Sequence, residues 1–256
     1  MIKRAPRDPL RLGPCSIRGA GRMLRVGLMA LGFVAGATPA CADIVAARYD
    51  APTTRYGHAV LGDAIEYGAL VITARDGAET RFELPQELVF EDIAPRLANV
   101  TGDGKPEVIT VEAHQDKGAR LVIWGQQGRI FATPFIGTRY RWLAPVGAAD
   151  FDGDGHIEIA YIDRPHLAKT LRIWRVEGDS FREIATLSGV SNHRIGEDFI
   201  SGGLRDCGQG IEMVVSDEAW RKVQVIGFSA DRVILHDTDA IPDATGFARV
   251  MACQDG

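Results

Sequence analysis

The chain has 256 residues, of which 46% are hydrophobic and 25% are charged, a composition that suits a globular protein rather than a disordered one. Of its 29 basic and 34 acidic residues, seven basic and one acidic lie in the first 42, which leaves 22 against 33 and a net charge of about −11 beyond that point. Such an acidic surface repels phosphate backbones and anionic membranes, and the sequence has no basic stripe to offset it. Nucleic acids and lipid headgroups are therefore disfavoured as partners.

The first segment of the chain predicts a secretory signal peptide over residues 1–42. A basic stretch precedes an apolar run from Val26 to Ala37, and Ala40 and Ala42 provide a small-residue cleavage site. The run is shorter than the roughly 20 residues that a membrane-spanning helix needs, which argues against a membrane anchor. We therefore predict a single domain over residues 43–256 of a periplasmic or secreted protein, with no stable membrane insertion after cleavage.

Two further interpretations concern the same segment. A signal peptide of ordinary length also begins at Met23, so the true translation start is either Met1 or Met23. A lipoprotein modified at Cys41 is disfavoured, because the sequence lacks the leucine expected three residues earlier.

A short acidic pattern recurs beyond residue 56, each time in front of an apolar run. In chain order its copies are a shortened one at Val60–Glu66, one at Asn99–Glu107, one at Asp150–Glu158, a degenerate one at Leu204–Glu212, and an apparent opening of another at Arg249–Gly256. A period of roughly 50 residues is typical of repeat proteins and propellers.

The best-preserved copy predicts a calcium loop. Asp150, Asp152, Asp154 and Glu158 stand at its first, third, fifth and ninth positions, separated by glycines. Neighbouring carboxylates repel by roughly 3–4 kcal/mol per pair at an effective dielectric near 20, and a divalent cation with oxygen ligands removes that cost. The alternative is a turn whose carboxylates only accept hydrogen bonds from backbone N–H groups.

The copy upstream is a weaker candidate for the same ion. Asn99, Thr101, Asp103 and Glu107 share the spacing, but two carboxylates are replaced by an amide and a hydroxyl. Less negative charge means lower calcium affinity, so whether this loop holds calcium stays open.

Alternating apolar residues, frequent Gly, Asp and Asn, and little helical periodicity predict an all-β chain. Four strands per unit is the geometry of a propeller blade. A large aromatic residue recurs in the second strand after each loop, and we expect core packing rather than a ligand platform for this set: Phe82, Trp124, Trp174 and Phe228.

The ends of the chain suggest how such a propeller would close. Residues 44–49 resemble the last strand of a unit and residues 247–256 resemble a first strand, so the two ends are expected to share a blade. We therefore predict a small β-propeller of four or five blades; an open, incomplete propeller is the alternative.

The repeats from about residue 56 to 256 resemble the FG-GAP/VCBS family, which is found in integrin α-subunit propellers and in many exported bacterial proteins. The resemblance implies Ca²⁺ bound by the side chains of Asp150, Asp152, Asp154 and Glu158 and by the backbone carbonyl of His156. Its role would be structural. An EF-hand is excluded because Tyr161 stands where that loop requires a late carboxylate.

Two cysteines, Cys207 and Cys253, follow the predicted signal peptide and occupy equivalent places in neighbouring copies. An oxidising compartment allows them to pair, and we expect a disulfide; two buried free thiols are the alternative.

No catalytic motif stands out, and no catalytic residue is assigned: the six histidines lack zinc-site spacing, and neither a nucleophile elbow nor a P-loop is present. We expect a monomeric, non-enzymatic module that binds a protein or glycan partner. The alternative is a periplasmic polysaccharide hydrolase or lyase, for which acidic pairs such as Asp63 with Glu66 or Glu197 with Asp198 are available.

Overall fold

The fold was derived from a computed structural model, which describes residues 43–230 and 232–254, so the predicted signal peptide lies outside the described residues. Within those ranges the chain is all-β apart from one short helix at its end. The elements are β1 Ile44–Thr53, β2 Glu66–Ala74, β3 Glu79–Glu83, β4 Leu88–Phe90, β5 Arg96–Ala98, β6 Glu107–His114, β7 Gly118–Gly125, β8 Gly128–Ala132, β9 Leu143–Ala149, β10 Glu158–Asp163, β11 Thr170–Glu177, β12 Ser180–Ser188, β13 Val190–Ser191, β14 Gly203–Asp206, β15 Ile211–Asp217, β16 Val223–Ser229, β17 Arg232–Asp237 and α1 Ala244–Met251.

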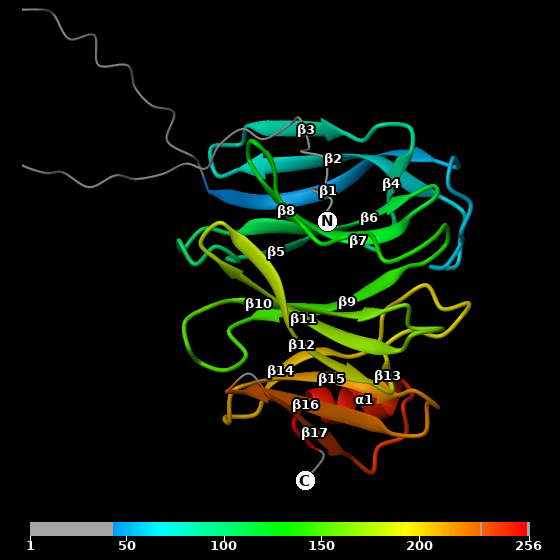
Figure 1. The fold of residues 1–256 in the computed structure, drawn as a ribbon, viewed down its shortest axis with the longest axis vertical. Helices are drawn as coiled ribbons and strands as arrows, with labels where there is room; N and C mark the ends of the chain where they lie inside the picture. Colours follow the sequence, from blue (N-terminus) through cyan, green and yellow to red (C-terminus); the bar gives the residue numbers. More distant parts are fainter. Residues whose placement is uncertain (1–42, 231, 255–256) are drawn as a thin grey trace, which may run out of the picture.

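The strands form three antiparallel sheets. The first contains β1 to β8 and is joined across its middle by a single pair, Tyr67 with Phe90, so it divides there into two smaller units. The second contains β9 to β12 in chain order, and the third contains β13 to β17. The units follow one another along the long axis of the molecule, from β1–β3 at one end to β14–β17 and α1 at the other (Figure 1).

Apolar side chains from facing sheets fill the space between successive units. One cluster joins Ile109 and Leu121 of the first sheet to Ile159 of the second, and another joins Ile173 of the second sheet to Val215 of the third. The recurring aromatic residues lie in apolar clusters, as expected. Phe82 contacts Trp124 with ring centroids 5.2 Å apart, Trp174 packs on the cluster between the first and second sheets, and Phe228 belongs to the cluster between the second and third.

The C-terminal segment does not form the first strand of a shared blade, so that expectation is wrong. Residues 244–251 form α1, because Asp243 caps the helix by accepting a 2.8 Å hydrogen bond from the Gly246 amide. Phe247 and Val250 lie one helical turn apart and pack on Val214 and Val225 of the last sheet. The helix therefore covers the outer face of the stack at this end.

The other end of the stack is covered differently. In β1, β2 and β3, register places Arg48, Val71 and Arg81 on one face, opposite to the cluster that holds Leu70. Arg48 pairs with Glu79, and Arg81 pairs with Asp50, across the small side chains of β2. Each end of the stack is thus covered: ion pairs cover the first unit, and a helix covers the last, as in capped repeat proteins.

The expected disulfide is present between Cys207, which follows β14, and Cys253, which follows α1. It ties the helix to the loop beside it. Arg205 supports the same junction through a 2.6 Å hydrogen bond to the Val250 carbonyl.

Replacing both cysteines by serine should lower the free energy of unfolding by up to about 4 kcal/mol, because a sequence separation of 46 closes a long loop in the unfolded chain. Urea denaturation measures the difference, and the reduced unmodified protein should match the double variant. Equal stability of the oxidised protein and the variant would contradict a structural role for the bond.

Candidate metal centre

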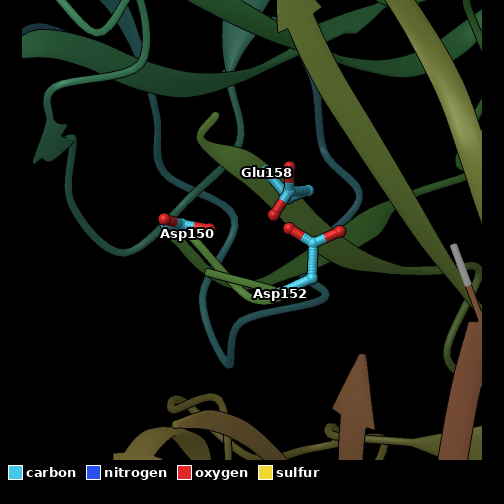
Figure 2. A group of neighbouring side chains, drawn as sticks. All are labelled: Asp150, Asp152 and Glu158. Atoms are coloured by element: carbon cyan, nitrogen blue, oxygen red, sulfur yellow. The ribbon is translucent and has the colours of Figure 1, made fainter. Parts of the chain in front are cut away.

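The acidic loop connects β9 to β10 and gathers three of its predicted ligands. Asp150, Asp152 and Glu158 each offer a carboxylate oxygen, and these oxygens all lie within 4.8 Å of one another. Figure 2 shows Asp152 and Glu158 pointing toward each other, with Asp150 beside them on the loop. Glu158 is the first residue of β10 and is fully buried.

Backbone hydrogen bonds shape this loop. The Asp150 carboxylate accepts bonds from the amides of Gly153, Asp154 and Gly155 at 2.7, 3.1 and 2.9 Å. The two glycines adopt φ values of 76° and 90°, which side chains with a Cβ rarely adopt. The backbone turn that the sequence left as an alternative to calcium is therefore formed by Asp150 itself.

Arg175 lies opposite Glu158 in the β10–β11 register and reaches three carboxylates. Its nitrogens stand 2.5 Å from Glu158, 3.0 Å from Asp152 and 2.9 Å from Asp154. Burial raises the pKa of Glu158, while the Phe151 amide and Arg175 act in the opposite direction. One guanidinium against four carboxylates leaves an excess of negative charge in the loop.

The donor set fits a hard cation such as Ca²⁺. The Oδ1 atom of Asp152 is buried without a hydrogen-bond partner, and its neighbours in the cluster are carboxylate oxygens. Unpaired buried oxygens are costly, and calcium prefers oxygen ligands. Asp150, Asp152 and Glu158 would hold the ion; Asp154 bonds Arg175 and the His156 amide outside the cluster, and the His156 side chain is exposed.

The Asn99 loop, between β5 and β6, uses its polar side chains internally. The Glu107 carboxylate accepts hydrogen bonds from the amides of Val100 and Thr101 at 2.8 and 3.1 Å and from the Thr101 hydroxyl at 3.0 Å. Asn99 and Asp103 accept bonds from the amides of Gly104 and Lys105. Asn99, Thr101, Asp103 and Glu107 are thus all engaged in hydrogen bonds within the loop.

The two loops share a role for their last glutamate that sequence analysis missed. Glu107 and Glu158 both open the strand after the loop and accept a bond from the amide of the second loop residue. The spacing alone suggested only a metal ligand. Glu66, at the start of β2, is likewise buried, and its burial together with the neighbouring carboxylate of Glu91 raises its pKa to about 9.

The family comparison supports the repeat assignment. Residues 99–161 match the model described as an FG-GAP-like repeat, which spans both loops and the strands between them. The chain therefore carries an FG-GAP-like repeat, as its sequence pattern predicted. No curated protein matched the chain.

Three solved structures show partial similarity, each at 13% identity. Rhamnogalacturonan lyase YesW aligns over 66% of this chain and 42% of its own (TM-score 0.43), and exotype rhamnogalacturonan lyase YesX over 77% and 47% (TM-score 0.45). A protein from Lactobacillus plantarum aligns over 68% and 52% (TM-score 0.35). The matched region is thus about half of each of these chains.

Glu66→Gln should stabilise the protein at pH 8 and leave it nearly unchanged at pH 4. The folded-state pKa of about 9 exceeds the ordinary 4.5, so the stabilising proton is retained at low pH and its contribution declines as pH rises between these values. We expect a melting temperature higher by about 3 °C or more at pH 8. Glu83→Gln, on exposed β3, is the control. An equal change in melting temperature at pH 8 and pH 4 for Glu66→Gln would contradict a raised pKa of Glu66.

Proposed function

We propose that this protein is an exported, non-enzymatic binding or scaffold module, built as a small propeller-like stack of four sheet units, whose acidic loop takes a structural Ca²⁺. The unpartnered, buried Oδ1 of Asp152 among the carboxylates of Asp150 and Glu158 carries the calcium part of the proposal. When bound, the ion would neutralise the loop and stabilise the folded state.

The placement of the acidic residues supports a module over a polysaccharide hydrolase or lyase. Of the acids considered for that activity, Asp63, Glu197 and Asp198 lie on connecting loops, whereas Glu66 and the neighbouring acids Glu91 and Asp92 are only 4%, 0% and 3% exposed. Glu91 bonds His58, and Asp92 pairs with Arg96. These acids are therefore enclosed by the fold.

The connecting loops support a role in display. Leu167, Ile195 and Phe199 are 60%, 83% and 51% exposed, on the β10–β11 and β13–β14 connections. Exposed apolar side chains on loops are suited to contact a partner. The disulfide fits an oxidising compartment, and no helix in the described part of the chain is long and apolar enough to cross a membrane.

Calcium should raise the melting temperature relative to chelator by roughly 3–8 °C, which corresponds to about 1–3 kcal/mol of linkage. Asp152→Asn should remove this shift because it deletes a charge from the cluster. Asp103→Asn, in the Asn99 loop, is the matched control and should retain the shift. A melting temperature that ignores calcium in the unmodified protein would refute the proposal.

Arg175→Met should make stability more dependent on calcium. The substitution removes the cation that contacts Asp152, Asp154 and Glu158, so the ion would have more charge to neutralise. The difference in melting temperature between calcium and chelator should exceed that of the unmodified protein. Arg182→Met, on the exposed strand β12, is the control. If the difference is smaller in the Arg175 variant than in the unmodified protein, Arg175 and the ion do not neutralise the same carboxylates.

A further inference from the structure

A small pocket lies at the end of β10 remote from the acidic loop. It has a volume of about 30 Å³ and is lined by residues of the β1–β2, β8–β9 and β10–β11 connections, among them His58, Tyr140, Arg141 and His166. One water molecule needs roughly 10–15 Å³ by the same measure, so the pocket accepts a small polar group of a ligand whose remainder stays outside.

His58 is oriented by a buried acid behind the pocket. Its Nδ1 lies 2.5 Å from Oε1 of Glu91, which is fully buried and whose second oxygen has no hydrogen-bond partner. Burial raises the pKa of Glu91 well above its usual value, whereas burial and Arg141 lower that of His58 to about 4. When Glu91 is protonated, its Oε1–H donates to Nδ1 of His58, and the Nε2–H of His58 is left as a donor at the pocket.

His166 is oriented by a second hydrogen-bond chain. Nε2 of His193 lies 3.0 Å from the Glu197 carbonyl, which can only accept, so His193 is protonated there and its Nδ1 accepts. Nε2 of His166 lies 2.8 Å from that Nδ1 and is therefore the donor. Burial lowers the pKa of His166 to about 4, so its Nδ1 is left as a neutral acceptor.

The charges around the pocket favour an anion. Arg141 has no carboxylate partner among the described residues, and it is close enough to lower the pKa of His58. Asp163 is paired by both Arg164 and Arg172, at 2.7 and 2.9 Å, and Arg172 also pairs with Glu183 at 2.7 Å, so that group is balanced and Arg141 is the excess cation. A local cation in an acidic protein draws anionic groups to this place.

The backbone around the pocket is held in uncommon conformations. Ala59, Tyr140 and Arg164 have φ values of 55°, 63° and 46°. Such residues cost of order 1–3 kcal/mol each and concentrate at ligand sites. The Tyr140 amide donates a 3.0 Å hydrogen bond to the Tyr56 hydroxyl, and the Tyr140 ring stacks on His58 with centroids 4.9 Å apart. The fold therefore fixes the imidazole as well as the loop.

We propose that this pocket binds the hydroxycarboxylate group of a small acid. The carboxylate would pair with Arg141, and the neighbouring hydroxyl would accept a hydrogen bond from His58 and donate one to His166. A hydroxyl both donates and accepts, so it matches this fixed donor and acceptor. The same chemistry is offered by a free hydroxy acid and by an acidic sugar residue at a chain end.

Four probes test the proposal by amide chemical-shift titration with calcium present. L-lactate and D-glucuronate represent the two sources, while propionate lacks the hydroxyl and D-glucose lacks the carboxylate. We expect shifts around residues 58, 140–142 and 164–167 with at least one acid below about 10 mM, and binding at least about fivefold weaker for its control. Glucuronate alone would indicate a saccharide ligand, lactate alone a free acid, and both the shared group.

Arg141→Met should weaken acid binding about tenfold or more, since a charge-assisted hydrogen bond is lost. Arg139→Met is the matched control: Arg139 lies on the same loop, is exposed and stacks on Tyr140, and its loss should leave affinity unchanged. The proposal is overturned if neither acid shifts these amides, if each control binds as well as its acid, or if both arginine variants lose affinity equally.

A melting curve of each variant separates lost binding from lost folding. Should Arg141→Met not fold, the comparison of lactate with propionate and of glucuronate with glucose on the unmodified protein decides the matter. The binding test does not depend on the acidic loop, so it can fail while calcium stabilisation holds, and the reverse.

Discussion

The structure depends on a glutamate carboxylate buried where the second strand of a unit begins. Glu107 and Glu158 accept bonds from the amide of the second residue of the preceding loop, which fixes how the first strand turns into the second. A desolvated carboxylate requires compensation, and the units provide it differently. Thr101 supplies a hydroxyl and a second amide in one loop, whereas Arg175 supplies a cation in the other. In the more acidic loop the buried glutamate is balanced by a full positive charge, and bound calcium would add further positive charge there.

In the third sheet, which is the fourth unit, a covalent bond takes the place of the polar contacts of the loop. Its loop lacks two of the predicted ligand side chains, and here Cys207 bonds Cys253 beyond α1. The helix thereby stays on the last sheet, where Phe247 and Val250 pack against Val214. At the opposite end, ion pairs cover β2. Because each terminal face of the stack is already covered, the first and last units do not need to pack against each other.

Local patterns predicted most of the repeating structure, because spacing and alternation determine strands, loops and interlayer aromatic residues. They failed where contacts between distant segments decide. Residues 247–251 carry the apolar spacing of a helix, but their resemblance to the opening of the earlier repeats favours a strand. Arg175 meets Glu158 only through strand register, and the partnership of His58 with Glu91 joins segments 33 residues apart. Two acidic residues directly after the apolar strand β4, Glu91 and Asp92, are the sequence feature that could have indicated a buried acid there.

Calorimetric titration of calcium into the protein tests the central claim most directly, namely that Asp150, Asp152 and Glu158 form a site for one ion. The account predicts close to one equivalent of Ca²⁺ per chain for the unmodified protein, and no detectable binding heat for Asp152→Asn. Absence of binding to the unmodified protein, or an unchanged titration of the Asp152 variant, would contradict it.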